Sequence, residues 1–297
     1  MKKIGIDLGN SSIKAAVITK GEVKTTLVKS LATIDSEDTN NIVNIAGQNV
    51  YFGVGTPLIE NDKTKRKYLE ESILLMCYKL YGPGVHEIEL GLSLPINLYK
   101  LSKELYKSKL EAIGEIMGRV NSDDITCKLK RVEIFAEGLS AFYALQPEIP
   151  KENILFIDIG YRTTDTLCIG VEQGKWIMQG SSTLETGAYD MIELLKGPIY
   201  EQTGVFFTTS QIEAYLTENR MIGAYDINSS LEVLKPLVEA AMKQIEQLYN
   251  DTPVRHLYFI GGGSKLFTSQ LEGYRYTLLK NEDKLIYSNS VGNYMKL

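Results

Sequence analysis

Two stretches of this chain repeat a pattern of residue types that suits phosphate binding. Residues 4–14 read IGIDLGNSSIK, and residues 154–165 read ILFIDIGYRTTD. In each, an apolar run ends in Asp, an aliphatic residue and Gly, and a polar turn leads to a second apolar run, which predicts a β-hairpin. A glycine in such a turn lets backbone N–H groups approach a phosphate without an obstructing Cβ. A lone Asp-x-Gly is usually only a hairpin, so the inference rests on its repetition about half a chain length apart.

The charged residues of the two turns suit a nucleotide and its metal ion. Asp7 and Asp158 begin the turns, where a carboxylate can hold Mg²⁺ through water, because this small cation keeps much of its hydration shell. Lys14 is available as a point charge for phosphates. The simpler interpretation is that both aspartates only form turns, but their symmetrical placement favours metal binding. Thr163 and Thr164 either hydrogen-bond phosphate or only satisfy the turn.

A third glycine cluster lies near the C-terminus. Residues 256–267 read HLYFIGGGSKLF, a short apolar strand that runs into Gly261, Gly262 and Gly263. These glycines allow a close approach of the backbone to a nucleoside and its phosphates. Before the cluster, residues 231–249 place apolar side chains at spacings of three and four, which predicts a helix packed on the core.

Two details of the helical segments can be predicted. Ser229 with Glu232 is expected to cap the helix over residues 231–249, and Pro236 to kink its first turns. Residues 132–145, VEIFAEGLSAFYAL, change from a strand into a helix. The small residues of this second helix let a neighbouring backbone approach closely, which suits a helix that crosses between two domains.

The composition is that of an ordinary globular protein. Of the 297 residues, 44% are hydrophobic and 23% charged, which excludes a disordered chain or a rod. At roughly 100–200 residues per domain, two domains are expected. The net charge of -5 argues against sequence-blind DNA binding by the whole surface. The three cysteines are scattered, which favours a reduced, cytoplasmic protein. The sequence has no run of the roughly 18 apolar residues that a membrane helix needs, so we expect a soluble protein without a membrane partner.

Five segments together resemble the motifs of the actin/heat-shock-ATPase/sugar-kinase superfamily, and they occur in the same order. They are a phosphate motif, a connecting motif, a second phosphate motif, an adenosine motif and a second connecting motif, at residues 7–14, 136–141, 158–165, 261–264 and 288–294. The resemblance covers nearly the whole chain. Tyr161 and Arg162 depart from it, since many relatives have smaller residues there.

This resemblance implies a fold and a set of ligands. The fold class is α/β, an actin-like (ribonuclease-H-like) duplicated two-domain fold with an interdomain nucleotide cleft. Domain I takes residues 1–150 plus 276–297, and domain II takes residues 151–275. Mg²⁺ is implied at Asp7 and Asp158, through water. The implied ligands of ATP, with GTP as an alternative, are Gly9, Asn10, Ser11, Ser12, Lys14, Gly160, Thr163, Thr164, Gly261, Gly262, Gly263 and Ser264.

Glu137 is the catalytic residue that the resemblance implies. Its counterpart in the family orients or polarises the water that attacks the nucleotide. Considered by itself, Glu137 is better explained as an acid favoured by the macrodipole at a helix N-terminus. The five-motif context favours catalysis. Glu133, expected one helical turn earlier, is the alternative.

Within the superfamily, the chain is most similar to ParM-type plasmid-segregation actins and their archaeal actin-like relatives. The short length, GLSLPINLYK at residues 91–100 and SNSVGNYMKL at residues 288–297 carry this finer resemblance. It implies an ATPase that forms homopolymeric filaments and moves plasmid DNA through a DNA-binding adaptor protein. The contact with DNA would be indirect.

Several alternatives remain open from the residues alone. A small-molecule kinase of the same superfamily is the second hypothesis, although no sugar-kinase signature is present. A scaffold at a membrane is the third hypothesis. Membrane-attached relatives usually carry an amphipathic tail, which is not expected in this chain. The basic run at residues 63–67, KTKRK, is interpreted as a solvated surface, although it could contact DNA, an adaptor or a second subunit. Gly187 marks either a turn near the base or a helix cap.

Overall fold

In the computed structural model, the chain forms two compact units. Unit 1 is Met1–Pro150 with Asn281–Leu297, and unit 2 is Lys151–Lys280. The structure describes residues 1–38, 40–60, 62–271, 273–274 and 282–297. The predicted domain boundary between residues 275 and 276 lies outside these described residues. Each unit has a hydrophobic core of its own.

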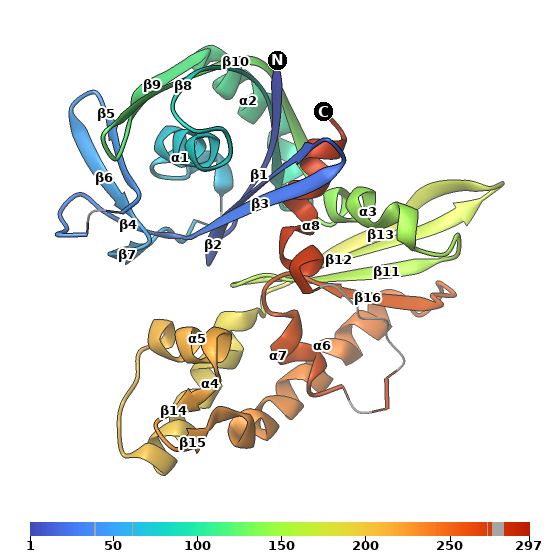
Figure 1. The fold of residues 1–297 in the computed structure, drawn as a ribbon. Coiled ribbons are helices and arrows are strands. Elements are labelled where there is room, and N and C mark those ends of the chain that lie inside the picture. Colours follow the sequence, from blue (N-terminus) through green and yellow to red (C-terminus); the bar gives the residue numbers. More distant parts are fainter. Residues whose placement is uncertain (39, 61, 272, 275–281) are drawn as a thin grey trace. The chain divides into compact units, whose positions relative to one another are not determined.

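The described strands of unit 1 form one sheet of ten, in the order β3-β2-β1-β8-β10-β9-β5-β6-β4-β7. These strands curve around helix α1 (Figure 1). β1 and β10 both run parallel to β8 between them. Residues 88–94 of β8 are buried without interruption, which is typical of a strand covered on both faces. The strands span β1 Lys2–Leu8, β2 Ser12–Thr19, β3 Glu22–Lys29, β4 Leu31–Thr33, β5 Ile42–Ile45, β6 Gln48–Phe52, β7 Thr56–Pro57, β8 Gly84–Leu94, β9 Glu115–Val120 and β10 Asp123–Ala136.

The helices of unit 1 include the last helix of the chain, α8, which packs on β1 and on α3. Glycines permit this close approach, because a Cβ on Gly5 would lie 2.0 Å from the Ser290 carbonyl oxygen. A Cβ on Gly292 would lie 1.7 Å from the carbonyl oxygen of Ser140 in α3. The helices span η1 Lys63–Lys65, α1 Leu69–Tyr81, α2 Ile96–Ile113, α3 Leu139–Leu145, η2 Gln146–Glu148 and α8 Glu282–Met295.

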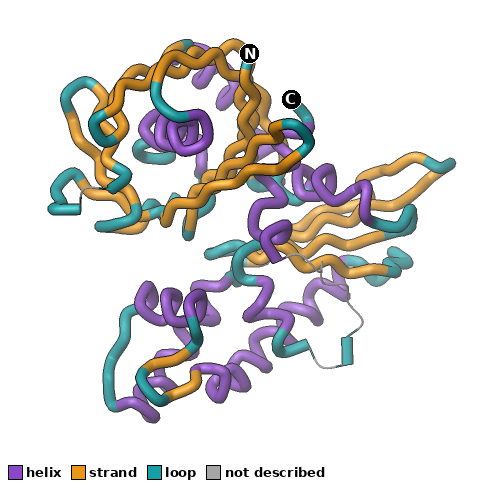
Figure 2. Tube along the Cα trace, in the orientation of Figure 1, coloured by secondary structure: helices purple, strands orange, loops and turns teal. Residues whose placement is uncertain are grey.

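Unit 2 has a four-stranded sheet in the order β13-β12-β11-β16, and a small pair of strands, β14 and β15, within the described residues. Its helices gather on one side of the larger sheet (Figure 2). The elements span β11 Ile154–Ile159, β12 Thr164–Glu172, β13 Lys175–Leu184, α4 Ala188–Thr203, α5 Thr209–Glu218, β14 Met221–Ile222, β15 Tyr225–Asp226, η3 Ile227–Leu234, α6 Lys235–Leu248, β16 His256–Ile260 and α7 Ser264–Thr268.

The structure confirms both predicted hairpins and the change from strand to helix over residues 132–145. The helix predicted over residues 231–249 has a different start. A 3-10 helix, η3, begins after Asp226, whose side chain caps it by accepting the N–H of Asn228. Pro236 then stands in the first turn of α6. Proline lacks an N–H that an α-helix needs only after its first turn, so Pro236 starts a helix here rather than kinking one.

None of the helices in the described part of the chain is both long enough and apolar enough to cross a membrane.

Candidate functional site

The first hairpin turn lies between β1 and β2 in unit 1. Asp7, at the end of β1, is opposite Lys14 in the strand register and is buried. The Lys14 ammonium lies 3.4 Å from the Asp7 carboxylate. The turn between them is tight, because a Cβ on Gly9 would lie 2.7 Å from the carbonyl oxygen of Ser12. The glycine is therefore required by the turn itself, whatever it binds.

The interpretation of residues 63–67 as a solvated surface is wrong for two of the basic residues. Lys63 and Arg66 are only 6% and 3% exposed, whereas the Lys65 side chain is 76% exposed. The reason is the 3-10 geometry of η1, in which side chains three residues apart point the same way. Lys63 and Arg66 therefore turn inward together while Lys65 faces solvent.

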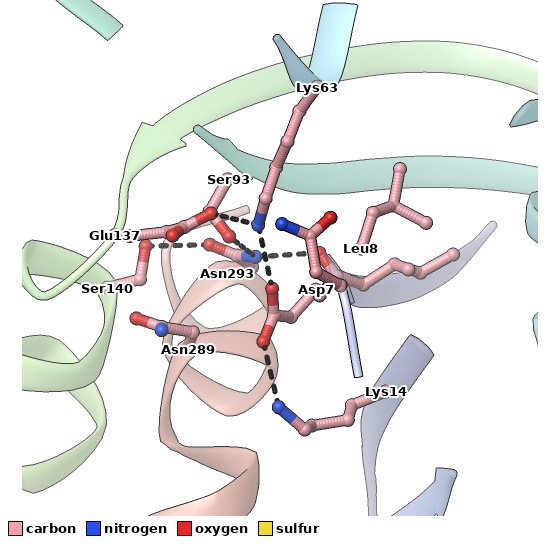
Figure 3. A network of polar contacts seen from close by, with 12 residues as sticks. Asp7, Leu8, Lys14, Lys63, Ser93, Glu137, Ser140, Asn289 and Asn293 are labelled. Atoms are coloured by element: carbon pink, nitrogen blue, oxygen red, sulfur yellow. Dashed lines mark hydrogen bonds and ion pairs between the residues drawn. The ribbon is translucent and has the colours of Figure 1, made fainter. Parts of the chain in front are cut away.

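Lys63 joins two carboxylates of unit 1 (Figure 3). Its ammonium lies 3.5 Å from the Asp7 carboxylate and forms an ion pair with the Glu137 carboxylate. Burial opposes the charge of the ammonium, but Glu137 and Asp7 outweigh it and raise the pKa of Lys63. Burial likewise opposes the charge of Asp7, but Lys14 and Lys63 hold the pKa of Asp7 below its ordinary value. Lys63 and Asp7 are therefore both charged at neutral pH.

Arg66 braces the first turn from outside the hairpin. Its guanidinium donates to the carbonyl oxygen of Leu8 at 3.0 Å and to the hydroxyl of Ser30 at 2.9 Å. The Ser30 hydroxyl in turn donates to the Gly9 carbonyl oxygen at 2.5 Å. Burial lowers the pKa of Arg66 to about 10, which leaves it charged at neutral pH. The turn is thus held by a charged side chain that is remote in the sequence.

Residues 58–60 and 62–66, here called the bracing segment, make several contacts with the first turn and with Ser30 beside it. Besides Lys63 and Arg66, the segment contributes the N–H of Glu60, which donates to the Asn10 side chain at 3.1 Å. The N–H of Leu58 donates to the Ser30 carbonyl oxygen at 2.7 Å. No local motif in the sequence predicts the bracing segment, because its contacts with the first turn join residues about fifty positions apart.

Glu137 lies between β10 and α3 and is buried. Its N–H donates to the Leu94 carbonyl oxygen at 2.8 Å. The next N–H, that of Gly138, donates to the Asn289 side chain in α8 at 3.1 Å. The loop that carries Glu137 is therefore fixed on both sides, so its carboxylate is held in one place beside Lys63.

Asn293 of α8 ties the surrounding elements together. Its amide donates to the Ile6 carbonyl oxygen at 2.9 Å and to the Ser93 hydroxyl at 3.2 Å. Its oxygen accepts from the Ser140 hydroxyl at 2.7 Å (Figure 3). The predicted second connecting motif at residues 288–294 thus lies on α8 and links β1, β8 and α3.

Glu133 does not lie one helical turn before Glu137, because strand β10 continues through both residue 133 and Ala136. Its carboxylate pairs with Lys107 and with Arg131, each at 3.2 Å. Burial opposes its charge, but these two partners lower the pKa of Glu133. The structure therefore places Glu133 in a different ion-pair group from Glu137.

The second hairpin turn, between β11 and β12 in unit 2, is held by uncharged donors. The N–H of Gly160 donates to the Thr163 carbonyl oxygen at 2.9 Å, which closes the turn. The Thr164 hydroxyl donates to the Thr186 carbonyl oxygen at 2.7 Å. The Asp165 carboxylate accepts from the Thr183 hydroxyl at 2.5 Å. Asp165 thus supports the hairpin, and the hydroxyl of Thr164 is already used by the fold.

Helix α4 explains the bulky residues Tyr161 and Arg162. The N–H of Tyr189 donates to the Tyr161 carbonyl oxygen at 2.8 Å. The Arg162 guanidinium lies 4.5 Å from the centre of the Tyr189 ring. Gly187 caps α4 by donating its N–H to the Asp190 carboxylate at 2.9 Å. Helix capping thus accounts for Gly187, and the side chains of Tyr161 and Arg162 both lie against the Tyr189 ring within unit 2.

The glycine-rich turn after β16 lies against the second hairpin, because β16 runs parallel to β11. A Cβ on Gly261 would lie 2.4 Å from a carboxylate oxygen of Asp158, and one on Gly263 would lie 2.6 Å from Ile159 Cγ2. Packing alone requires these two glycines. A Cβ on Gly262 would meet nothing within 4 Å among the described residues. The Ser264 hydroxyl donates to the Gly261 carbonyl oxygen at 2.9 Å.

Within its own unit, the aspartate of each hairpin turn has the chemistry of a ligand for a magnesium ion that keeps its water shell. In the residues that the structure describes, no group of three or more His, Cys, Asp or Glu side chains could bind a metal directly. Asp7 and Asp158 each place a buried carboxylate at the start of a hairpin turn. Such hard oxygen donors suit a hydrated Mg²⁺ better than a metal that needs a full protein cage.

Comparison with known families agrees with this fold. Residues 5–139 match the family described as the N-terminal domain of actin-like proteins. Residues 156–273 match the C-terminal part of the family described as archaeal actin homologue MreB-like. The two matches together span most of the chain, and with the fold they show that the chain is an actin-like protein.

Individual relatives place the chain near archaeal actins and ParM. It is 25% identical to an archaeal actin homologue from Thermoplasma acidophilum over 75% of this chain and 74% of the relative. A crystal structure of an archaeal actin homologue superposes with a TM-score of 0.82 at 20% identity, over 100% and 99% of the two chains. The predicted actin-like α/β fold is confirmed.

Two further structures are similar in fold. The archaeal actin homologue in complex with ADP has a TM-score of 0.76 at 21% identity, over 99% of this chain and 98% of the other. A 15-stranded ParM filament from Clostridium botulinum has a TM-score of 0.75 at 16% identity, over 100% and 99%. The predicted resemblance to ParM-type actins is therefore confirmed at the level of the fold.

Proposed function

We propose that this protein is an actin-like ATPase that binds ATP with Mg²⁺, assembles into filaments and segregates plasmid DNA through a DNA-binding adaptor protein. GTP is the alternative nucleotide. The observation that carries the proposal is the repeated hairpin turn with a buried aspartate, the first of which is linked through Lys63 to Glu137. The ADP complex of the archaeal homologue and the ParM filament support it.

Phosphate binding is assigned to the two hairpin turns. Backbone N–H groups and the Lys14 ammonium would bind the phosphates, and Gly9 and Gly160 let each turn close tightly without a Cβ. Asp7 and Asp158 would hold Mg²⁺ through water, and the ion would neutralise charge on the phosphates. Of the three glycines in the turn after β16, Gly262 is the one at which a Cβ would meet no described neighbour. A nucleoside would therefore approach the turn at Gly262.

Hydrolysis is assigned to Glu137. Its carboxylate is fixed by the hydrogen bonds of its loop and by Lys63, so it can accept a hydrogen bond from a water molecule and orient it. A charged carboxylate suits this task, because phosphoryl transfer depends mainly on positioning and on charge compensation.

Self-assembly is the proposed use of the ATPase cycle. A lattice that favours one nucleotide state would couple hydrolysis to the stability of the polymer. The chain carries a net charge of -5, which fits indirect contact with DNA through an adaptor better than direct binding by the whole surface.

One experiment tests hydrolysis and assembly together, with Glu137→Gln and the matched control Glu133→Gln. Both are glutamates near the end of β10, but only Glu137 pairs with Lys63. Glu137→Gln should lower the hydrolysis rate by roughly 100-fold or more with nucleotide binding retained, and Glu133→Gln should hydrolyse at nearly the wild-type rate. Phosphate release and binding of a fluorescent nucleotide measure the two quantities.

Assembly is followed in the same samples by light scattering, pelleting and electron microscopy. Wild-type protein should form filaments with Mg-ATP, and the filaments of Glu137→Gln should persist because hydrolysis no longer weakens them. A protein that stays monomeric at micromolar concentration across salt and nucleotide conditions would contradict the filament proposal. Hydrolysis at the wild-type rate by Glu137→Gln would contradict the assignment of the catalytic residue.

A further inference from the structure

Lys63 is a buried cation that the hairpin motifs do not include. Asp62 starts η1 by accepting from the Thr64 N–H at 3.1 Å and from the Thr64 hydroxyl at 2.6 Å. This turn directs Lys63 inward and leaves Lys65 in solvent, where it pairs with Asp62 at 3.1 Å. Two lysines in one short turn thus have opposite surroundings.

The contacts of the Lys63 ammonium leave it with capacity for a further acceptor. An ammonium has three N–H donors. Among the described residues, its acceptors are the Asp7 and Glu137 carboxylates. Asp7 begins the first hairpin turn, and its other carboxylate oxygen faces Lys14. Lys63 therefore lies between the turn assigned to phosphate and the carboxylate assigned to water.

Structural need does not explain a lysine at this position well. A buried ion pair is on average no more stabilising than apolar residues of similar volume, because both charges lose their hydration. Lys63 also does not support the turn backbone, since Arg66 makes those hydrogen bonds. An ion pair retained beside the assigned water-orienting carboxylate points to a role in the chemistry.

We propose that Lys63 positions the Glu137 carboxylate and donates its remaining N–H to the terminal phosphate of the bound nucleotide. This inference rests on the proposed function. Lys63 then distinguishes a nucleoside triphosphate from a diphosphate, because only the triphosphate supplies the acceptor beside Glu137. Because Lys63 belongs to the bracing segment, binding of the triphosphate would also be coupled to this segment.

The test compares Lys63→Met with the control Lys65→Met, which removes a lysine from the same turn. Binding of ADP and of a non-hydrolysable ATP analogue is measured by calorimetry, so the readout does not depend on turnover. Lys63→Met should weaken binding of the ATP analogue roughly 10- to 100-fold and binding of ADP less than about threefold. Lys65→Met should keep the wild-type ratio of the two affinities, and Lys63→Arg should restore part of it.

Turnover gives a second readout on the same proteins. Lys63→Met should lower kcat roughly 100-fold, because Glu137 loses its fixed partner and the phosphate loses a donor. If Lys63→Met weakens both nucleotides equally, or binds both like the wild type, the proposal is overturned and Lys63 is only a structural counter-ion.

The double variant Lys63→Met/Glu137→Gln is the control for a loss of folding, because it removes both charges of this pair and leaves neither unbalanced. If the single variant is insoluble, a lost preference for the ATP analogue in the double variant supports the proposal, and a preserved preference overturns it. Failure of the proposed function is distinguishable, because wild-type protein would then bind neither nucleotide. If the wild-type protein binds and hydrolyses ATP and Lys63→Met does so equally well, only the proposed role of Lys63 is contradicted.

Discussion

The two hairpin turns share a backbone pattern but differ in what supports them. The first turn, in unit 1, is surrounded by Lys14, Lys63 and Arg66, and its aspartate is paired with two ammonium groups. The second turn, in unit 2, is supported by threonine hydroxyls and by backbone N–H groups at the start of α4. The repeat thus determines the shape of the turns, and the segments around each turn determine its electrostatics.

The largest expected effect is on the charged support of the first turn. Arg66→Ala should lower the free energy of unfolding by about 3 kcal/mol or more, because it removes two charge-assisted hydrogen bonds and a buried side chain. Thr183→Val removes one uncharged donor from the second turn and should cost about 1 kcal/mol. Urea denaturation of both variants measures the difference. Equal costs would contradict the contrast between charged and uncharged support.

A smaller effect is expected at the glycine-rich turn beside Asp158. Gly261 has a φ of +83°, and a Cβ there would meet the Asp158 carboxylate, so Gly261→Ala should cost about 2 kcal/mol or more. Gly262→Ala should change the unfolding free energy by less than about 0.5 kcal/mol. Thermal or urea unfolding of the two variants gives the comparison. If Gly262→Ala is the more damaging change, the proposed close packing against the second turn is wrong.

The smallest expected effect is at the cap that orients Lys63. Asp62→Ala should cost about 1 kcal/mol at pH 7, and Asp62→Asn much less because the amide oxygen can still accept from Thr64. The hydrogen bonds from Thr64 lower the pKa of Asp62 below its ordinary value of 3.8. A lowered pKa stabilises the fold above the unfolded-state pKa, and this contribution is lost as pH falls through the folded-state pKa. The difference between wild type and Asp62→Ala should therefore shrink below about pH 4, and a difference that grows there would exclude this role.

Local patterns were sufficient to predict the hairpins and the strand-to-helix segment. Alternation of apolar residues around an Asp-x-Gly turn depends on near neighbours only, so both hairpins could be identified. The same is true of residues 132–145. The start of the helical segment before residue 231 is predicted less well, since Ser229 and Asp226 are both good caps and the choice of Asp226 depends on packing around η3.

The candidate site could be predicted only in part. Asp7, Lys14 and Glu137 could be named from the motifs. In the structure, Asp7 pairs directly with Lys14, and Lys63 connects Asp7 to Glu137. Whether the named ligands bind a nucleotide stays a prediction for the experiments above. The roles of Asp165 and Gly187 as supports within unit 2 required the structure, because their partners follow only from tertiary contacts.

The sequence by itself therefore determined two glycine-containing hairpin turns, each begun by an aspartate, and the actin-like order of motifs. Only the tertiary structure decided that Lys63 and Arg66 are buried while Lys65 is exposed. The physical reason is that a basic side chain can be stable in either of two surroundings, in solvent or buried in contact with acceptors, and the basic run does not specify which. The acceptors of Lys63 and Arg66 lie 36 to 74 residues away in the chain. No local pattern of residues specifies pairing at such a separation, and it is this pairing that places a cation between Asp7 and Glu137.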